Sequence, residues 1–155
     1  MKKPRYLRWI LLAEAVGALS GFLSRKGNEF YSLYVQKPSF SPPDWLFPIA
    51  WGILYALMGI GAARVEAKPE STERSRGLNL FAIQLVVNFF WSLIFFNARA
   101  YGAALLWLLF LIVLVAAMTL TFFKTDRLAS YLQLPYLLWL AFAAVLNWAV
   151  WQLNR

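Results

Sequence analysis

The side chains in this sequence that could do chemistry are amides and indoles placed inside long apolar runs. In one run, Gln84, Asn88 and Trp91 recur at i, i+4 and i+7, which puts them on one face of a helix. In the last run, Trp139 and Asn147 share a stripe in the same way. Amides in an apolar environment must find hydrogen-bond partners, so both faces are expected to point inward. Such a site suits a flat, largely apolar ligand that stacks on indole rings and is oriented by the two asparagines.

Other kinds of chemistry are excluded by composition. The sequence contains no histidine and no cysteine, which rules out imidazole catalysis, a haem histidine, disulfides and thiolate chemistry. No metal site is expected and no cofactor is obligatory. Glu14 is the only acidic residue within an apolar run, and a carboxylate inside a membrane is a candidate functional group.

The elements that must position these residues are apolar runs long enough to cross a bilayer. At 155 residues the chain has the size of one domain, but 61% hydrophobic and 14% charged residues are too apolar for a soluble domain. A hydrocarbon core of about 30 Å requires about 20 helical residues. The sequence therefore predicts an all-α fold in a single domain over 1–155: an integral membrane bundle of five transmembrane helices, with a long first loop capping the bundle. We expect the spans at about 6–24, 44–65, 78–98, 102–123 and 128–152.

The net charge of +8 predicts topology in the membrane rather than nucleic-acid binding. With five spans, ten of the 15 Lys and Arg residues fall on the side of the N-terminus and five on the other. By the positive-inside rule, the N-terminus is cytoplasmic and the C-terminus lies outside. A cleaved signal peptide is the alternative for the first segment, but Glu14 in its middle is foreign to such signals.

The first span carries the small residues Ala13, Gly17 and Gly21 on one stripe, which allows close approach of another helix. That helix could belong to a second copy, giving a homodimer, or to the same chain. The segment 25–42, with four aromatic residues among polar ones, is too polar to span. It could lie at the membrane interface or fold over the helix ends as a lid.

Depth along the spans brings the polar and aromatic positions together. At about 1.5 Å per residue, Trp51, Trp91 and Asn147 lie roughly 12 Å below the outer surface. Asn88 is at roughly 16 Å and Trp139 at roughly 24 Å. These residues can line one pocket beneath the aromatic loop. The alternative is that the tryptophans only furnish interfacial belts and helix packing.

Four stretches of the chain, in order and from all parts of it, resemble the TspO/MBR family of tryptophan-rich sensory proteins and translocator proteins, once called peripheral benzodiazepine receptors. They are KPSFSPPDW followed by WGILYALMGIG, then QLVVNFFWSLIFF with NAR after it, and PYLLWLAFAAVLNWAVW.

The resemblance implies a five-helix membrane receptor or sensor for porphyrins, especially protoporphyrin IX, and for isoquinoline carboxamide or benzodiazepine-type ligands. It also implies that members are often dimeric. Carried onto this sequence, it places the ligand-binding residues at Trp51, Asn88, Trp91, Trp139, Ala143, Leu146 and Asn147, with Tyr31 and Pro42 at the lid.

Two alternatives to a receptor stay open. Some bacterial members of the family are thought to promote light- and oxygen-dependent breakdown of bound porphyrin, which would make Trp51 and Trp139 the catalytic residues. The other alternative is a tetrapyrrole transporter.

In the last span, Trp148 and Gln152 replace the Tyr and Arg of the cholesterol-recognition pattern of animal members. Cholesterol binding is therefore not expected, and a bacterial cytoplasmic membrane is the expected location.

Overall fold

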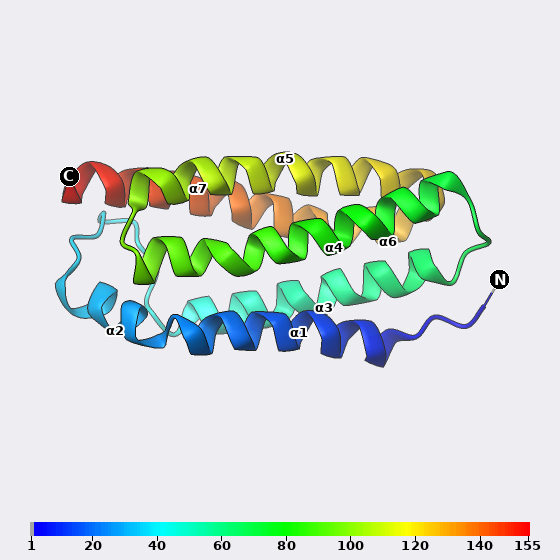
Figure 1. The fold of residues 1–155 in the computed structure, drawn as a ribbon, viewed down its shortest axis with the longest axis horizontal. Helices are drawn as coiled ribbons and strands as arrows, with labels where there is room; N and C mark the ends of the chain where they lie inside the picture. The colour runs from blue at the N-terminus through cyan, green and yellow to red at the C-terminus, as the bar shows by residue number, and fades with distance from the viewer. Residues whose placement is uncertain (1) are drawn as a thin grey trace.

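The structure, a computed structural model that describes residues 2–155, is a bundle of long helices (Figure 1). Five segments of the described chain are long and apolar enough to cross a membrane, which confirms the predicted all-α membrane bundle. The helices are α1 (Tyr6–Leu23), α2 (Arg25–Tyr34), α3 (Leu46–Glu66), α4 (Thr72–Ser92), the π-helix η1 (Leu93–Asn97), α5 (Tyr101–Thr125), α6 (Arg127–Tyr131) and α7 (Leu134–Asn154).

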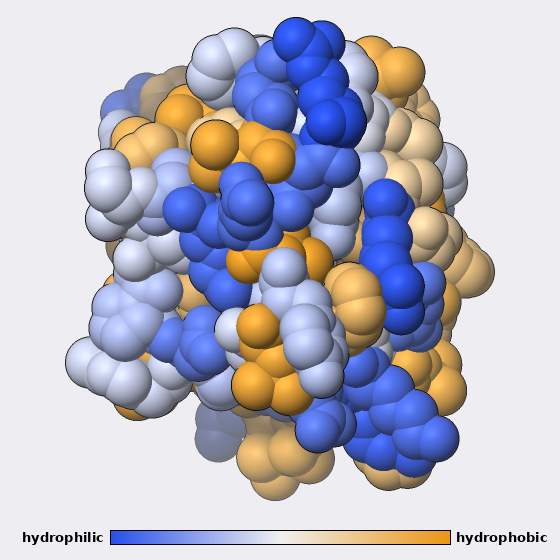
Figure 2. Space-filling model, turned by 90° about the vertical axis from the view of Figure 1, so that its left-hand side faces the viewer, coloured by the Kyte–Doolittle hydropathy of each residue, from blue (hydrophilic) through white to orange (hydrophobic). Residues whose placement is uncertain are grey.

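Successive spans run in opposite directions, so the connections gather at two ends (Figure 1). One end, here the N-terminal end, carries the N-terminus, the α3–α4 turn and the α5–α6 turn. The other, the α2 end, carries α2, the turn into α5 and the C-terminus. Seen end-on, the α2 end has many hydrophilic side chains across its centre, with hydrophobic ones among them and along the rim (Figure 2). The closest helix pairs are α1 with α3, α4 with α5 and α5 with α7.

The core follows from helical periodicity. Tyr55, Met58 and Ala62 on α3, spaced by three and four residues, are all buried, as their spacing predicts. On α5 the buried positions alternate with outward ones such as Leu106 and Val113, which are 71% and 65% exposed. Leucine and valine exposed on the outward face of a long helix suit a lipid environment rather than water.

Two predicted boundaries differ from the structure. The helix of the span expected at about 78–98 starts earlier than predicted, because α4 begins at Thr72. The Ser71 hydroxyl caps this helix by accepting a hydrogen bond from the Arg74 backbone N–H at 3.1 Å. Hydropathy marks the edge of the apolar run, whereas the helix continues beyond it. The last span is also interrupted, with Leu132 and Gln133 separating α6 from α7.

The first loop contains a helix that the sequence did not predict. Residues Arg25–Tyr34 form α2, which packs on η1 at the C-terminal end of α4. The turn that follows η1 holds Arg99 at φ 53°, in the left-handed region that a non-glycine residue rarely adopts. The first loop therefore covers the bundle as a folded element rather than as an extended chain.

Candidate functional site

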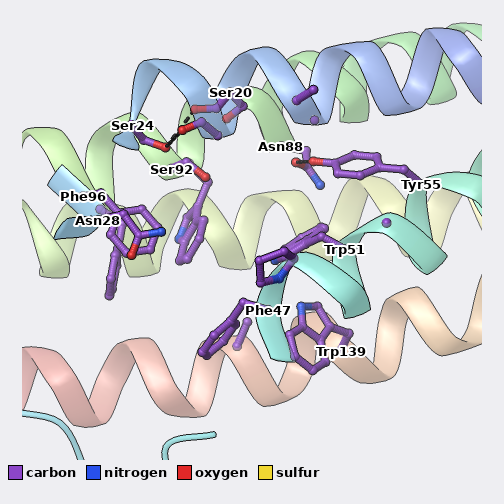
Figure 3. A pocket seen from close by; sticks show the side chains of 18 of the residues that line it. Ser20, Ser24, Asn28, Phe47, Trp51, Tyr55, Asn88, Ser92, Phe96 and Trp139 are labelled. Atoms are coloured by element: carbon purple, nitrogen blue, oxygen red, sulfur yellow. Dashed lines mark hydrogen bonds between the residues drawn. The ribbon is translucent and has the colours of Figure 1, made fainter. Parts of the chain in front are cut away.

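A cavity of about 410 Å³ opens beneath α2. Its walls come from α1, α2, α3, α4, η1 and α7 (Figure 3). Eight of the nine predicted ligand-binding residues line it, although they come from four separate parts of the chain; they are Tyr31, Trp51, Asn88, Trp91, Trp139, Ala143, Leu146 and Asn147. Pro42 is not among the lining residues.

One wall of the cavity is built from the indoles of α3 and α7. The Trp51 ring lies 5.5 Å from that of Tyr55 at an interplanar angle of 31°, and 6.4 Å from that of Trp139 at 86°. Phe47 meets the edge of Trp139 at 5.9 Å. Figure 3 shows Trp51, Phe47 and Trp139 grouped across the cavity from Ser92 and Asn28. The rings present broad π faces at fixed angles.

The wall contributed by α4 and η1 is aromatic as well. Trp91 stacks on Phe95, with ring centroids 4.9 Å apart and an angle of 25°. Because Phe95 is itself buried, its stacking contact holds the Trp91 ring in a fixed orientation. A flat ligand between the two walls would meet aromatic surface on both sides.

The amides beside these rings already have partners within the chain. Tyr55 Oη donates to Asn88 Oδ1 at 2.7 Å, and Asn88 Nδ2 donates to Tyr136 Oη at 2.6 Å. Tyr136 Oη in turn donates to Gln84 Oε1 at 2.8 Å. This buried chain of hydrogen bonds joins α3, α4 and α7 directly below the cavity. Asn88 therefore holds Tyr55 and the helices in place, a role that the expectation of a ligand-orienting amide did not include.

The helix α2, which corresponds to the lid expected from the sequence, packs on the π-helix η1. Tyr31 of α2 is only 6% exposed, and its ring lies 5.4 Å from Phe95 and 5.3 Å from Phe96. Burial raises the pKa of the Tyr31 phenol to about 12, so the group is neutral at physiological pH. The chain after α2 is tied to the C-terminus, because the backbone N–H and C=O of Gln36 both bond to the Asn154 side chain, at 3.0 and 2.8 Å.

The small residues of α1 serve contacts within the chain. Ala13 is completely buried. A Cβ added at Gly17 would collide with the Tyr55 ring, so this glycine is what lets α1 approach α3. Gly21 has no neighbour within 4 Å of an added Cβ and stays exposed. Of the two predicted alternatives for this stripe, packing within the chain is the one that Ala13 and Gly17 make, whereas Gly21 lines the cavity.

Several lining residues were not predicted. Phe142 comes three residues after Trp139, so the α7 stripe could have indicated it. Tyr55 likewise shares the α3 face of Trp51. Asn28 could not have been found, because its position depends on the unpredicted helix α2.

The cavity has no metal-binding set. Among residues 2–155, no three acidic, histidine or cysteine side chains come close enough together to hold a metal ion. The chemistry that the cavity offers is therefore apolar contact, aromatic stacking and a few polar groups at its edges.

Comparison with known proteins gives matches along nearly the whole chain. The model of the TspO/MBR family matches residues 9–152. Protein CrtK of Rhodobacter capsulatus is 38% identical over 144 residues, covering 92% of this chain and 89% of its own. The tryptophan-rich protein TspO of Chlorobaculum tepidum is also 38% identical over 144 residues, covering 92% and 91%. The translocator protein of Sus scrofa is 41% identical over 147 residues, covering 90% and 86%.

Proposed function

Because the chain belongs to the TspO/MBR family, we propose that it is a membrane receptor for porphyrins, protoporphyrin IX in particular, which bind in the cavity beneath α2. Isoquinoline carboxamides and benzodiazepine-type molecules would bind at the same place as drug-like, hydrophobic ligands. The protein acts as a sensor of a bound aromatic molecule.

The observation that carries this proposal is the pair of facing aromatic walls. Trp51 and Trp139 line one side of the cavity, and Trp91 with its stacked Phe95 lines the other. A planar macrocycle gains dispersion and stacking energy on both faces in such a space, whereas a compact polar ligand would leave the rings unused.

Titration with protoporphyrin IX, followed by quenching of tryptophan fluorescence, tests the proposal. We expect saturable binding to wild type and weaker binding to Trp51→Phe and Trp139→Phe. Trp148→Phe is the matched control, because Trp148 is 52% exposed on the same helix as Trp139 and does not line the cavity. Equal affinity for all four proteins would contradict the proposed site.

Photo-oxidative breakdown of the bound porphyrin is a second candidate function. The contact between Trp51 and Trp139, both lining the cavity, favours it because a photoexcited ligand would lie beside two oxidisable indoles. Light and molecular oxygen supply the excitation and the oxidant. Illumination in air is expected to bleach the porphyrin faster with wild type than with Trp139→Phe, and equal rates with and without protein would end this idea.

The charge distribution supports a location in a bacterial cytoplasmic membrane with the N-terminal end in the cytoplasm. Lys68 and Arg74 near the α3–α4 turn and Lys124 before α6 lie at that end, together with the basic N-terminus. Since the chain lacks cysteine, single cysteines at Lys3 and Arg155 can be labelled without background. A membrane-impermeant reagent applied from outside is expected to modify only the cysteine at position 155.

A homodimer also belongs to this proposal, and crosslinking in membranes can measure the oligomeric state.

A further inference from the structure

The polar groups that line the cavity divide into those that are hydrogen-bonded within the chain and those that are not. Asn88 and Asn147, the amides that the sequence suggested for orienting a ligand, belong to the first kind. The oxygen and the nitrogen of each amide both bond to other helices, so their first role is to hold the bundle together. A ligand is served more readily by a polar group that has no partner in the chain.

Ser92 carries such a group. Within a helix, a serine or threonine hydroxyl commonly donates to the carbonyl four residues earlier. Thr119 does so to Val115 at 2.7 Å, and Ser24 does so to Ser20 at 2.8 Å. No hydrogen bond within residues 2–155 engages the Ser92 hydroxyl, and Ser92 lines the cavity (Figure 3). In apolar surroundings an unpaired hydroxyl gains from a ligand that accepts its hydrogen bond.

Asn28 on α2 lies on the same side of the cavity as Ser92 (Figure 3). The packing of α2 on η1 brings the two together, because η1 begins directly after Ser92. A Cβ added at Gly27 would collide with the backbone of Phe96, so the residue beside Asn28 is in direct contact with η1. Asn28 is exposed at the mouth of the cavity, and its side chain has no hydrogen-bond partner in the described part of the chain.

Glu14, one of the two carboxylates that line the cavity, lies at a deeper level. The helices α1 and α4 run in the same direction, and the Ser20 hydroxyl of α1 donates to the Phe89 carbonyl of α4 at 2.8 Å. Ser92, three residues after Phe89, is therefore level with about residue 23 of α1. Glu14 is nine residues before that level, or roughly 13 Å along the helix axis.

Asp44, the other carboxylate, lies near the mouth together with basic side chains. Lys37 Nζ is 4.9 Å from the ring of Tyr31, and the Asp44 carboxylate contributes to the raised pKa of the same phenol. Residues 25–44 and Arg99 together carry four basic side chains and two acidic ones. The net charge at the mouth is therefore positive, which favours an anionic group on a ligand over a cationic one.

We propose that Ser92 and Asn28 hold the polar edge of the ligand, the Ser92 Oγ–H and the Asn28 Nδ2–H donating hydrogen bonds to a carboxylate. This inference rests on the proposed function, because it assigns the polar end of the same porphyrin site. The macrocycle lies between the aromatic walls, and its propionate groups point toward α2.

A matched pair of porphyrins tests the inference. One is mesoporphyrin IX, and the other is etioporphyrin III, the same macrocycle with ethyl groups in place of the two propionates. Both are titrated against the protein in nanodiscs of phosphatidylcholine, with empty nanodiscs as the blank for partition into lipid. The ratio of the two affinities isolates the contribution of the carboxylates.

Wild type is expected to bind mesoporphyrin IX more tightly than etioporphyrin III. Ser92→Ala is expected to reduce the affinity ratio by about tenfold, and Asn28→Ala is expected to reduce it by a smaller factor because Asn28 is exposed. Ser92→Thr keeps the hydroxyl and is expected to keep the ratio. Ser75→Ala is the matched control, because Ser75 is an exposed serine on α4 that does not line the cavity. The same ratio in wild type, Ser92→Ala and Asn28→Ala would overturn the inference.

Etioporphyrin III separates the two claims, because it has no carboxylate and binds through the aromatic walls alone. If Trp51→Phe weakens its binding while Ser92→Ala and Asn28→Ala leave the affinity ratio unchanged, only the inference about the polar edge fails. If neither porphyrin binds to wild type, the aromatic cavity is not a porphyrin site and both proposals fail.

Discussion

The indole N–H of Trp91 on α4 donates a hydrogen bond to Oδ1 of Asn147 on α7, at 3.2 Å. Nδ2 of the same asparagine donates to the Tyr101 carbonyl at the start of α5, at 2.9 Å. A single amide thus joins three membrane spans at the edge of the cavity.

Replacement of Asn147 by leucine is expected to lower the free energy of unfolding by about 1–3 kcal/mol, because it leaves the Trp91 N–H and the Tyr101 carbonyl without their partner. Unfolding by detergent, followed by circular dichroism, measures the change. In a double-mutant cycle with Trp91→Phe, the loss is expected to be less than the sum of the single losses. Strict additivity would show that the hydrogen bond contributes nothing.

Tyr136→Phe is expected to destabilise the protein more than Tyr131→Phe. The Tyr136 hydroxyl is fully buried between Asn88 and Gln84, and its removal leaves Asn88 Nδ2 and Gln84 Oε1 without that partner, at a cost of about 1–3 kcal/mol for each buried polar group. Tyr131 is 53% exposed, so its hydroxyl can be removed with little effect. Comparable unfolding midpoints for the two variants would contradict the role given to the buried hydrogen-bond chain.

Two glycines on the same face of α1 are expected to respond with opposite signs. Gly17→Ala forces a methyl group into the Tyr55 ring, and overpacking of this kind costs about 1–3 kcal/mol. Gly21→Ala meets no atom and gains helix propensity of up to about 1 kcal/mol. Thermal unfolding of both variants in the same detergent measures the difference, and a stabilising Gly17→Ala would refute the close α1–α3 contact.

The carboxyl group of Asp126 is expected to make the free energy of unfolding depend on pH. Burial tends to raise the pKa of its carboxyl, but hydrogen bonds from Arg64, the Ala129 backbone N–H and Lys68 outweigh it and hold the pKa below the usual 3.8. Because the pKa is lower in the folded state, the stabilisation is complete above about pH 4 and is lost as the pH falls through the folded-state value.

Unfolding temperatures of wild type and Asp126→Asn, measured from pH 7 down to pH 3, check this sign. The wild type is expected to be more stable at pH 7, and the gap is expected to narrow only below about pH 4. A gap that widens on acidification would contradict the lowered pKa.

The lid is expected to open more readily in Asn154→Ala. This variant removes both hydrogen bonds that tie Gln36 to the end of α7. Dissociation of protoporphyrin IX, followed by stopped-flow tryptophan fluorescence, is expected to accelerate several-fold, whereas Gln152→Ala on the same helix is expected to dissociate at the wild-type rate. An unchanged rate in Asn154→Ala would mean that ligand leaves by a route that does not involve the lid.

The sequence was sufficient for the spans and for most of the cavity, because both depend on periodicity within single helices. Uncharged runs predicted where the chain crosses the bilayer, and the spacing of Asn88 and Trp91 predicted which face turns inward. The layer shared by Trp91 and Asn147 followed from depth alone, and the structure joins the two residues by a hydrogen bond.

What the sequence did not show depends on contacts between helices. Nothing local distinguishes Gly17, which packs on Tyr55, from Gly21, which faces open space. The helix α2 was also missed, although its apolar residues have the spacing of an amphipathic helix, because the segment is short and polar overall and was assigned to a loop for that reason. The partners of Asn88 likewise come from two other spans.

The π-helix η1, at the C-terminal end of α4, makes the packing of α2 depend on the number of residues in this segment. In η1 the Ala98 N–H reaches back to the Leu93 carbonyl, so this turn holds one residue more than an α-helical turn. Deleting that residue would rotate the chain after it by about a quarter turn about the helix axis. Tyr31 would then lose its contacts with the rings of Phe95 and Phe96. The packing of α2 on η1 therefore depends on the number of residues in η1. This short segment is expected to tolerate most conservative substitutions but not a single insertion or deletion.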